Sequence, residues 1–301
     1  MKISILGHGS IGKRHYGNIE MIGHTAAWWD PADYGSFQST LRQDVIDWGD
    51  AVIICSPSKD HANDLMDVID AGKHVLCEKP FGYDCPSLLA GFMQGTRLKN
   101  PHLIVATGFN LRFHDCVKKA RELIPELGDL RGSAFTVNQK TEKPPYLRDG
   151  IIRNWLSHEI DLARHLLGPI EEVVSCTAPV DGNGNDSVEA HVVIKFPSVT
   201  NNVHFQADYY SDPEQRYFWI EGEHGALYCD LVKRNLFMRG KDGKHRQVLA
   251  ATDSFDGNYI DEMRCFIKSI ENGHHMPPLA TGEDGVACLY AVMAAREKAG
   301  I

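Results

Sequence analysis

The tripeptide Glu78-Lys79-Pro80 has the residue types needed for proton transfer. A lysine can donate to a substrate hydroxyl or exchange a proton with it, and a neighbouring carboxylate can orient that lysine. Pro80 restricts Lys79 to an extended conformation. The segment 73–77 is a predicted strand of a doubly wound sheet, and ligands bind beside the carboxyl ends of such strands. Lys79 is therefore a candidate acid or base, although a solvated surface lysine remains the alternative.

A second candidate cluster lies on a predicted helix at 153–167. Spacings of four, three and four residues place Asn154, His158, Asp161 and His165 along one stripe of this helix. The stripe suits an acid–base site or a solvent-facing surface. A shared metal ion is disfavoured, because His158 and His165 are separated by about 10.5 Å along the axis at 1.5 Å per residue.

The segment Gly7–Gly12 reads GHGSIG and stands between an apolar strand pattern and a helix pattern. Gly7 permits a tight turn, Gly9 lets the backbone approach a pyrophosphate, and Gly12 lets the helix pack closely against the strand. The helix start then presents N–H groups and the positive end of its dipole to phosphates. This pattern predicts a dinucleotide site; a fortuitous glycine turn is the alternative.

Asp30 ends the next apolar run, eighteen residues after Gly12. An acid at that place accepts hydrogen bonds from the adenosine ribose hydroxyls and repels a 2′-phosphate. Pro31 follows, where a site for NADP often has an arginine. The sequence therefore predicts NAD as the cofactor, preferred over NADP.

The first part of the chain alternates between strand and helix patterns, which predicts a Rossmann-type doubly wound parallel sheet over residues 1–122. These patterns comprise strands at 50–55, 73–77 and 103–107, and helices at 61–71 and 85–98.

Period-two alternation dominates after about residue 125 and predicts an α+β domain over 123–301 with a largely antiparallel open sheet. The strands are expected at 187–196, 203–209, 217–221 and 226–231, with turns at 181–184 and 223–225. Two helices, at about 259–272 and 282–299, close the chain.

Several of these segments resemble the glucose–fructose oxidoreductase / inositol dehydrogenase family (Gfo/Idh/MocA) over nearly the whole chain. The matching segments are Gly7–Gly12, Ser56-Pro57 with His61, Gly72–Pro80, Gly108–Phe113, Gly128–Leu130, Ser157–Leu162, Ile220–Leu227 and Thr281–Gly285. Glu78-Lys79-Pro80 is the most specific of them.

The resemblance implies an NAD(P)-dependent oxidoreductase that acts on a secondary alcohol of a sugar, cyclitol or sugar derivative. It implies that Lys79 relays the proton, that His158 is its partner on the substrate side, and that Asp161 orients His158 or the substrate. The cofactor residues would be Gly7, His8, Gly9, Ser10, Ile11, Gly12, Asp30, Ser56, Pro57, His61, Glu78 and Lys79. The substrate residues would be Lys79, Asn110, Arg112, Arg153, Asn154 and Asp161, with no metal.

Asn154 departs from the family pattern, in which many members have an aspartate four residues before the histidine. Asparagine can bind a substrate but cannot act as a carboxylate base, so proton transfer would depend on Lys79 and His158. Four further residues, Arg112, Tyr146, Arg148 and Arg153, make the expected pocket wall cationic, which favours an acidic or phosphorylated substrate. The alternative is that these arginines lie on the surface.

Two further functions remain open. A non-catalytic dinucleotide sensor of the same fold would explain Asn154, and redox-neutral chemistry with tightly bound NAD would give no net NADH.

Composition excludes several classes of partner. A formal charge of −9 over 301 residues argues against non-specific nucleic-acid binding. No apolar stretch approaches the roughly 20 residues needed to span a bilayer, so no membrane partner is expected. Eight scattered cysteines without a C-x-x-C pair, and the absence of a signal sequence, favour the cytoplasm.

The second predicted sheet is expected to have an exposed face with His204, Gln206, Asp208 and Tyr210. Relatives often pair such sheets, so a homodimer or homotetramer is predicted.

Overall fold

A computed structural model describes residues 1–32, 41–140, 150–179, 188–250 and 255–301. Among the helices in these ranges, none is both long and apolar enough to cross a membrane.

The chain folds into two compact units, which differ from the linear division expected at residues 122 and 123. Unit 1 comprises Met1–Asn110 and Phe255–Leu289, and unit 2 comprises Leu111–Ser254 and Tyr290–Ile301. The difference arises because the chain returns to unit 1 near its end. There β14 (Ala280–Thr281) pairs with a strand of the first sheet, and α7 (Phe255–Asn272) packs against the first helix.

Sheet A in unit 1 is the parallel sheet that the sequence predicts, with β14 added antiparallel to β5. Its order in the described chain is β14-β5-β4-β3-β1-β2. The parallel strands are β1 (Lys2–Leu6), β2 (Thr25–Trp29), β3 (Ala51–Ile54), β4 (His74–Glu78) and β5 (Val105–Gly108). Nearly every side chain of β1, β3, β4 and β5 is buried, which explains why these strands read as continuous apolar runs.

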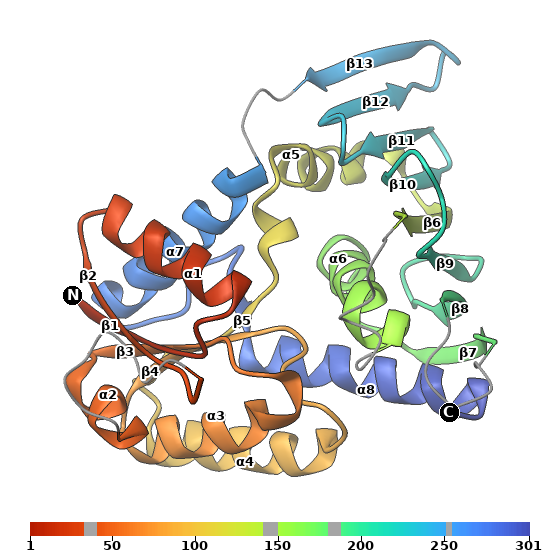
Figure 1. The fold of residues 1–301 in the computed structure, drawn as a ribbon. Helices are drawn as coiled ribbons and strands as arrows, with labels where there is room; N and C mark the ends of the chain where they lie inside the picture. The colour runs from red at the N-terminus through yellow and green to blue at the C-terminus, as the bar shows by residue number, and fades with distance from the viewer. Residues whose placement is uncertain (33–40, 141–149, 180–187, 251–254) are drawn as a thin grey trace. The chain divides into compact units, whose positions relative to one another are not determined.

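Helices cover both faces of sheet A. Figure 1 shows α1 and α7 on one face and α2, α3 and α4 on the other. Right-handed crossovers produce this arrangement, because the chain steps from β1 to β2 in one direction and from β2 through β5 in the other. The helices are α1 (Ser10–Met21), α2 (Arg42–Trp48), α3 (His61–Asp70) and α4 (Pro86–Lys99), with a short 3-10 turn η1 (Ser58–Asp60).

Sheet B in unit 2 is largely antiparallel, as predicted; its one parallel pair in the described chain is β6 with β9. Its order is β13-β12-β11-β10-β6-β9-β8-β7. The strands are β6 (Leu130–Asn138), β7 (Glu172–Thr177), β8 (Glu189–Lys195), β9 (Val203–Asp208), β10 (Gln215–Gly222), β11 (Gly225–Asp230), β12 (Asn235–Arg239) and β13 (His245–Ala250).

The inner face of sheet B forms the core of unit 2. Phe135 stacks between Phe205 and Phe218, with ring centroids 5.3 and 5.5 Å apart. The helices of this unit are α5 (Asp115–Leu123), which contacts β11 to β13, and α6 (Ser157–Leu167), which contacts β6. Short turns η2 (Asn110–Phe113) and η3 (Ile124–Leu127) flank α5, and α8 (Gly282–Ala299) starts in unit 1 and ends in unit 2.

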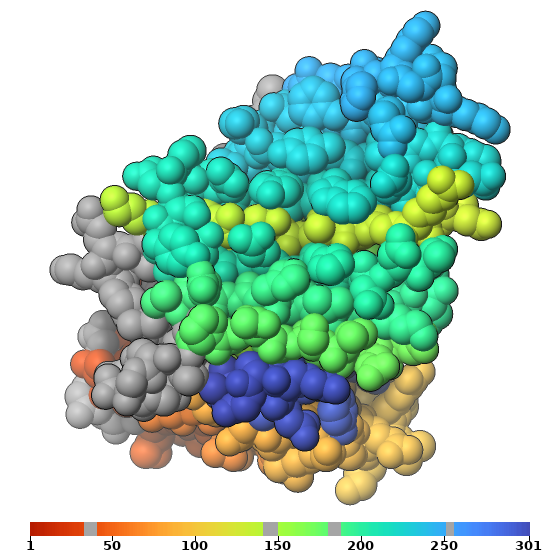
Figure 2. Space-filling model, turned by 90° about the vertical axis from the view of Figure 1, so that its right-hand side faces the viewer, coloured from red at the N-terminus to blue at the C-terminus, as the bar shows by residue number. Residues whose placement is uncertain are grey.

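The outer face of sheet B is open in Figure 2, where rows of side chains run from β13 and β12 at the top to β7. His204, Gln206 and Tyr210 are exposed as expected. Asp208 is not: it is 3 % exposed, and its carboxylate accepts hydrogen bonds from the N–H groups of Tyr210 and Ser211. Asp208 therefore holds a turn and does not contribute to the outer face.

Candidate active site

The glycine-rich loop between β1 and α1 has the close contacts that its glycines predict. Gly7 has a φ of +91°, and its N–H donates to the Trp29 carbonyl oxygen at 2.8 Å. A β-carbon on Gly7 would lie 2.5 Å from the Cys55 carbonyl oxygen, and one on Gly12 would lie 2.1 Å from the Gly7 carbonyl oxygen. The loop therefore lies directly against the ends of β1 and β3, and α1 starts in contact with it.

The first turn of α1 suits an anion. Gly9 is the N-cap and makes no side-chain cap, and the first turn has no acidic residue. A β-carbon on Gly9 would meet nothing within 4 Å, so the space beside this backbone is open. Uncapped N–H groups and the helix dipole together favour a phosphate at this place. The residues present therefore fit a dinucleotide.

Asp30 lies just beyond β2 and faces the same loop. One carboxylate oxygen accepts the His8 N–H at 2.8 Å and the other accepts the Ala32 N–H at 2.9 Å. The His8 ring stacks on Trp28, with centroids 3.8 Å apart and planes 7° apart. Asp30 is only half-buried, so its oxygens keep room to accept from a ribose hydroxyl.

His61 is 1 % exposed and joins the ends of β3 and β4. Its two ring nitrogens lie 2.8 Å from the Ser56 carbonyl oxygen and 2.7 Å from the Pro80 carbonyl oxygen. The Ser56 hydroxyl donates to Asp64 at 2.5 Å, while Pro57 is exposed. His61 thus fixes the backbone that follows β3 and β4. Direct cofactor contacts by Ser56, Pro57 and His61 remain predictions.

Glu78 and Lys79 lie at the end of β4, as the sequence predicts. Glu78 is 7 % exposed, and its Oε1 lies 2.8 Å from Nε2 of His15 on α1. Its Oε2 accepts the Lys79 N–H at 3.3 Å. Lys79 is half-buried. The carboxylate therefore contacts the backbone of the candidate proton-relay residue.

Asn110, predicted to bind substrate, is 2 % exposed in unit 1. Its side-chain nitrogen is buried and has no hydrogen-bond partner in the described part of the chain. A buried amide donor is costly when unpaired, so this nitrogen is a candidate contact for a ligand oxygen.

In unit 2 the predicted helix at 153–167 begins as a π-helical turn, η4 (Ile152–Leu156), that continues into α6. The wider turn changes the phase between Asn154 and His158 from that of a regular helix. The Asn154 amide donates to the Tyr209 hydroxyl at 3.3 Å, and Trp155 packs edge-on against Tyr209 at 4.4 Å. Asn154 and His158 are both half-buried, so both remain candidates for substrate contact.

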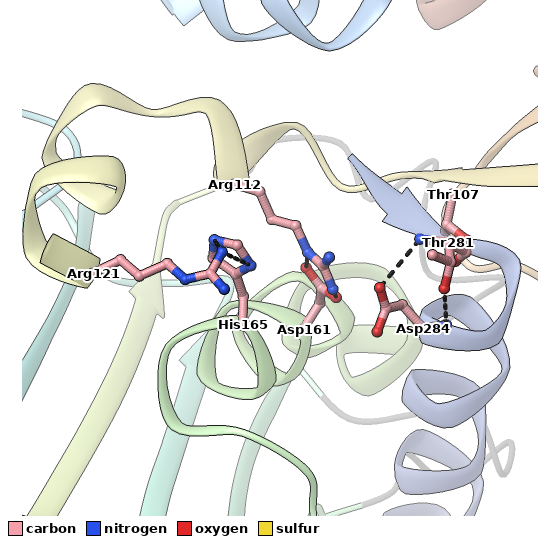
Figure 3. A network of polar contacts seen from close by, with 7 residues as sticks. All are labelled: Thr107, Arg112, Arg121, Asp161, His165, Thr281 and Asp284. Atoms are coloured by element: carbon pink, nitrogen blue, oxygen red, sulfur yellow. Dashed lines mark hydrogen bonds and ion pairs between the residues drawn. The ribbon is translucent and has the colours of Figure 1, made fainter. Parts of the chain in front are cut away.

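Arg112 and Asp161 form a buried ion pair, shown in Figure 3. Arg112 donates from Nε and Nη2 to the two Asp161 oxygens at 2.8 and 2.5 Å. Their side chains are 6 % and 2 % exposed. The pair neutralises the positive charge that Arg112 was expected to add to a pocket wall. His165, further along α6, lies 3.2 Å from Arg121.

The surface-arginine alternative is wrong for Arg112 and Arg153. Arg153 is 6 % exposed, and its Nη2 lies 3.9 Å from the Met293 sulfur. The other two residues of the expected cationic wall, Tyr146 and Arg148, lie outside the described residues, as does the predicted turn at 181–184.

Sequence reasoning missed His15, Tyr209 and the ion pair of the half-buried Arg216 with the buried Glu159 at 2.7 Å. His15 had a usable signal: Ile11, His15 and Ile19 are spaced by four residues, which places the histidine on the inward stripe of α1. In the described ranges, no group of three or more His, Cys, Asp or Glu residues is arranged to hold a metal ion.

Two family models match the chain. The model described as the oxidoreductase family with an NAD-binding Rossmann fold matches residues 18–88, and that of the GFO/IDH/MocA C-terminal domain matches residues 117–228.

Curated relatives match over almost the full length. Myo-inositol 2-dehydrogenase of Thermotoga maritima is 27 % identical, covering 99 % of this chain and 96 % of the relative. D-xylose 1-dehydrogenase (NADP(+)) 2 of Haloferax volcanii is 26 % identical, covering 89 % and 83 %.

Among solved structures, levoglucosan dehydrogenase in complex with NADH and levoglucosan has a TM-score of 0.85 at 18 % identity. It covers 100 % of this chain and 97 % of that one. This likeness supports the fold described above.

Proposed function

Because the chain belongs to the Gfo/Idh/MocA family of oxidoreductases, we propose that it exchanges a hydride between NAD(H) and a secondary alcohol or ketone of a sugar, cyclitol or sugar-acid derivative. One observation supports this proposal most: the uncapped start of α1, which suits an anion, and Lys79 both lie at the carboxyl edge of sheet A. The names of the relatives, which include an inositol, a xylose and a levoglucosan dehydrogenase, support the substrate class.

The residues of unit 1 hold the cofactor in this proposal. The Gly7–Gly12 loop and the first turn of α1 bind the pyrophosphate, and Asp30 accepts from the adenosine ribose. Bound nicotinamide supplies or accepts the hydride. Lys79 then exchanges a proton with the substrate oxygen, with Glu78 orienting its backbone.

The residues of α6 and η4 contribute the substrate side. His158 is the partner of Lys79 in proton transfer, and Asn154 binds a substrate hydroxyl while Tyr209 orients its amide. Asn154 cannot accept a proton as an aspartate would, so proton transfer depends on Lys79 and His158.

The test of this proposal is turnover at 340 nm with NAD⁺ and myo-inositol, D-xylose or levoglucosan, for wild type and Lys79→Met. We expect Lys79→Met to lower kcat by about 10²–10⁴-fold with nearly unchanged NADH affinity, the usual range for general acid–base catalysis. A Lys79→Met enzyme that keeps the wild-type kcat would contradict it. Cofactor binding without turnover of any compound would favour the sensor.

We further propose that NAD is preferred over NADP, because the Asp30 carboxylate repels a 2′-phosphate. The Haloferax volcanii relative is named for NADP, so the preference varies among relatives. We expect NADH to bind at least about tenfold more tightly than NADPH, which is about 1.4 kcal/mol. Asp30→Asn should reduce the difference in affinity between NADH and NADPH. It should also weaken the binding of NADH, because an asparagine has one acceptor oxygen in place of the two that now accept the His8 and Ala32 N–H groups. Equal affinities in wild type would contradict the preference.

A homodimer or homotetramer and a cytoplasmic location complete the proposal. The open outer face of sheet B, with half-buried to exposed aromatic side chains, supports self-association. All eight cysteines are free thiols in the described chain, in keeping with a reducing compartment.

A further inference from the structure

The Glu78 carboxylate is enclosed on three sides. One side is the Lys79 N–H that donates to Oε2, and another is Nε2 of His15 at 2.8 Å from Oε1. The third is Gly108 at the end of β5, where a β-carbon would lie 3.2 to 3.3 Å from all three carboxyl atoms. The absence of a side chain at Gly108 therefore gives the Glu78 carboxylate its room, and the two donors set where the carboxylate lies.

His15 has no other hydrogen bond in the described part of the chain. It is 0 % exposed, and its second ring nitrogen, Nδ1, is buried and unpartnered there. Because a carboxylate oxygen only accepts, Nε2 of His15 donates in the contact with Glu78. In the described part of the chain, the one hydrogen bond of the His15 side chain is therefore the bond to Glu78.

Two elements fix the His15 ring. It lies in the second turn of α1, and Tyr259 of α7 packs edge-on against it at 5.9 Å. Arg14 lies over the Tyr259 ring at 4.9 Å and pairs with Asp256 at 3.3 Å. A ring held in this way gives Glu78 Oε1 a donor at a fixed position.

We propose that His15 is a positioning residue for Lys79, acting through Glu78. The contact runs from α1, which starts at the glycine-rich loop, through one buried carboxylate to the Lys79 backbone. Without the His15 donor, Glu78 is a buried carboxylate with one lost partner, and it shifts toward other donors. The Lys79 backbone loses a fixed acceptor, and misplacement by about 1 Å is enough to lower turnover about 10²-fold. This inference rests on the proposed role of Lys79 in proton transfer.

The activity test uses His15→Leu, which removes the donor, and His15→Gln, whose amide can still donate to Oε1. The assay is the 340 nm reaction with NAD⁺ and the fastest of myo-inositol, D-xylose and levoglucosan. We expect His15→Leu to lower kcat by about 10- to 100-fold while KM and the NADH dissociation constant stay within about threefold. His15→Gln should recover most of the loss. His102→Leu, at an exposed histidine, is the matched control and should behave as wild type.

The double variant His15→Leu/Lys79→Met separates positioning from a general loss of structure. If His15 acts through Lys79, adding His15→Leu to Lys79→Met lowers kcat little further. The inference would be overturned if the losses in kcat from the two substitutions were fully additive. It would also be overturned if His15→Leu kept the wild-type kcat while Lys79→Met was slow. Either result would leave the proposed function intact. An unchanged kcat in Lys79→Met would instead overturn the proposed function.

A second readout needs no substrate. In the histidine ¹⁵N–¹H spectrum of the wild type, we expect a protonated Nε2 on His15 whose resonance moves in Glu78→Gln and is missing in His15→Leu. An unprotonated Nε2, or a resonance that Glu78→Gln leaves in place, would show that His15 does not hold Glu78.

Discussion

At the scale of single residues, the ion pair between Arg112 and Asp161 shows how a candidate binding residue acquires a structural role. Each side chain is nearly fully buried, and each charge is compensated by the other. Removing one partner takes this ion pair away from a buried charge, whereas removing both also removes both charges. The pair therefore contributes to the stability of unit 2 whether or not it also borders a substrate.

We expect Arg112→Met and Asp161→Leu to lower the free energy of unfolding by about 3–5 kcal/mol each, measured by urea unfolding at pH 7. The double variant should be less destabilised than the sum of the two. If the losses in free energy of unfolding of the two single variants simply added, the two side chains would not stabilise each other.

The sequence identified both residues as site candidates but did not pair them. Their positions are 49 residues apart, and only the packing of η2 against α6 brings the guanidinium to the carboxylate. The same holds for His15 and Glu78, which are 63 residues apart. Residue type and local spacing identify groups that can do chemistry; long-range contacts decide which of them are already paired.

At the scale of elements, the contact between the glycine-rich loop and α1 depends on the absence of a side chain. A β-carbon on Gly12 would lie 2.1 Å from the Gly7 carbonyl oxygen, so Gly12→Ala must push the helix away from the loop. We expect the dissociation constant for NADH to rise about tenfold or more in a fluorescence titration.

Gly17→Ala is the matched control on the same helix, because a β-carbon there meets nothing within 4 Å. It should leave NADH affinity unchanged and stabilise the protein by up to about 1 kcal/mol. Equal effects of both substitutions on affinity would show that the loop contact is unimportant.

The start of α5 carries a thiol with an unusual titration. A hydrogen bond from the Cys229 thiol lowers the pKa of Cys116 to about 5, and His114 and Arg234 act in the same direction, while burial opposes them. Burial raises the pKa of Cys229. The pKa of Cys116 is therefore lower in the folded chain than in the unfolded chain.

The stability that this thiolate contributes is present above the unfolded pKa and is lost as the pH falls through about 5. We expect the free energy of unfolding to rise with pH between 6 and 8 in wild type, and to rise less in Cys116→Ser. Urea unfolding of both proteins at pH 6 and pH 8 measures these free energies. An equal rise with pH in wild type and Cys116→Ser would contradict the lowered pKa of Cys116.

The sequence predicted the elements of unit 1 closely because parallel strands are buried on both faces and their apolar runs end at clear turns. The second unit was predicted less completely. Strands β12 and β13 lie at one edge of sheet B, where β13 is largely exposed and has weak alternation. The π-helical turn before α6 was not foreseen, since its wider hydrogen bonding leaves no separate mark in the residue pattern.

At the scale of the whole molecule, the outer face of sheet B carries a row of aromatic residues. Tyr217 lies 5.7 Å from Tyr228, which lies 6.5 Å from Phe237, and Trp219 is 36 % exposed beside them. An open apolar row of this kind suits a second copy of the chain.

We expect Trp219→Glu to shift the mass in light scattering toward the 33.6 kDa monomer, because a buried carboxylate at the interface would lack a partner. Leu98→Glu is the control: Leu98 is 79 % exposed but belongs to α4 of unit 1 and is not part of sheet B. A wild type that is already monomeric at micromolar concentration would contradict the proposed oligomer.

The return of the chain to unit 1 has a consequence for synthesis on the ribosome. Unit 1 needs α7 and β14, so it cannot be complete until residue 289 has been translated. At roughly 5–20 residues per second, that comes about 9–36 s after residue 110. During this interval one edge of sheet A and the face that α7 covers have no partner from their own chain. Expression of residues 1–110 alone should therefore yield a fragment that aggregates through its unpaired strand edge and its uncovered apolar face.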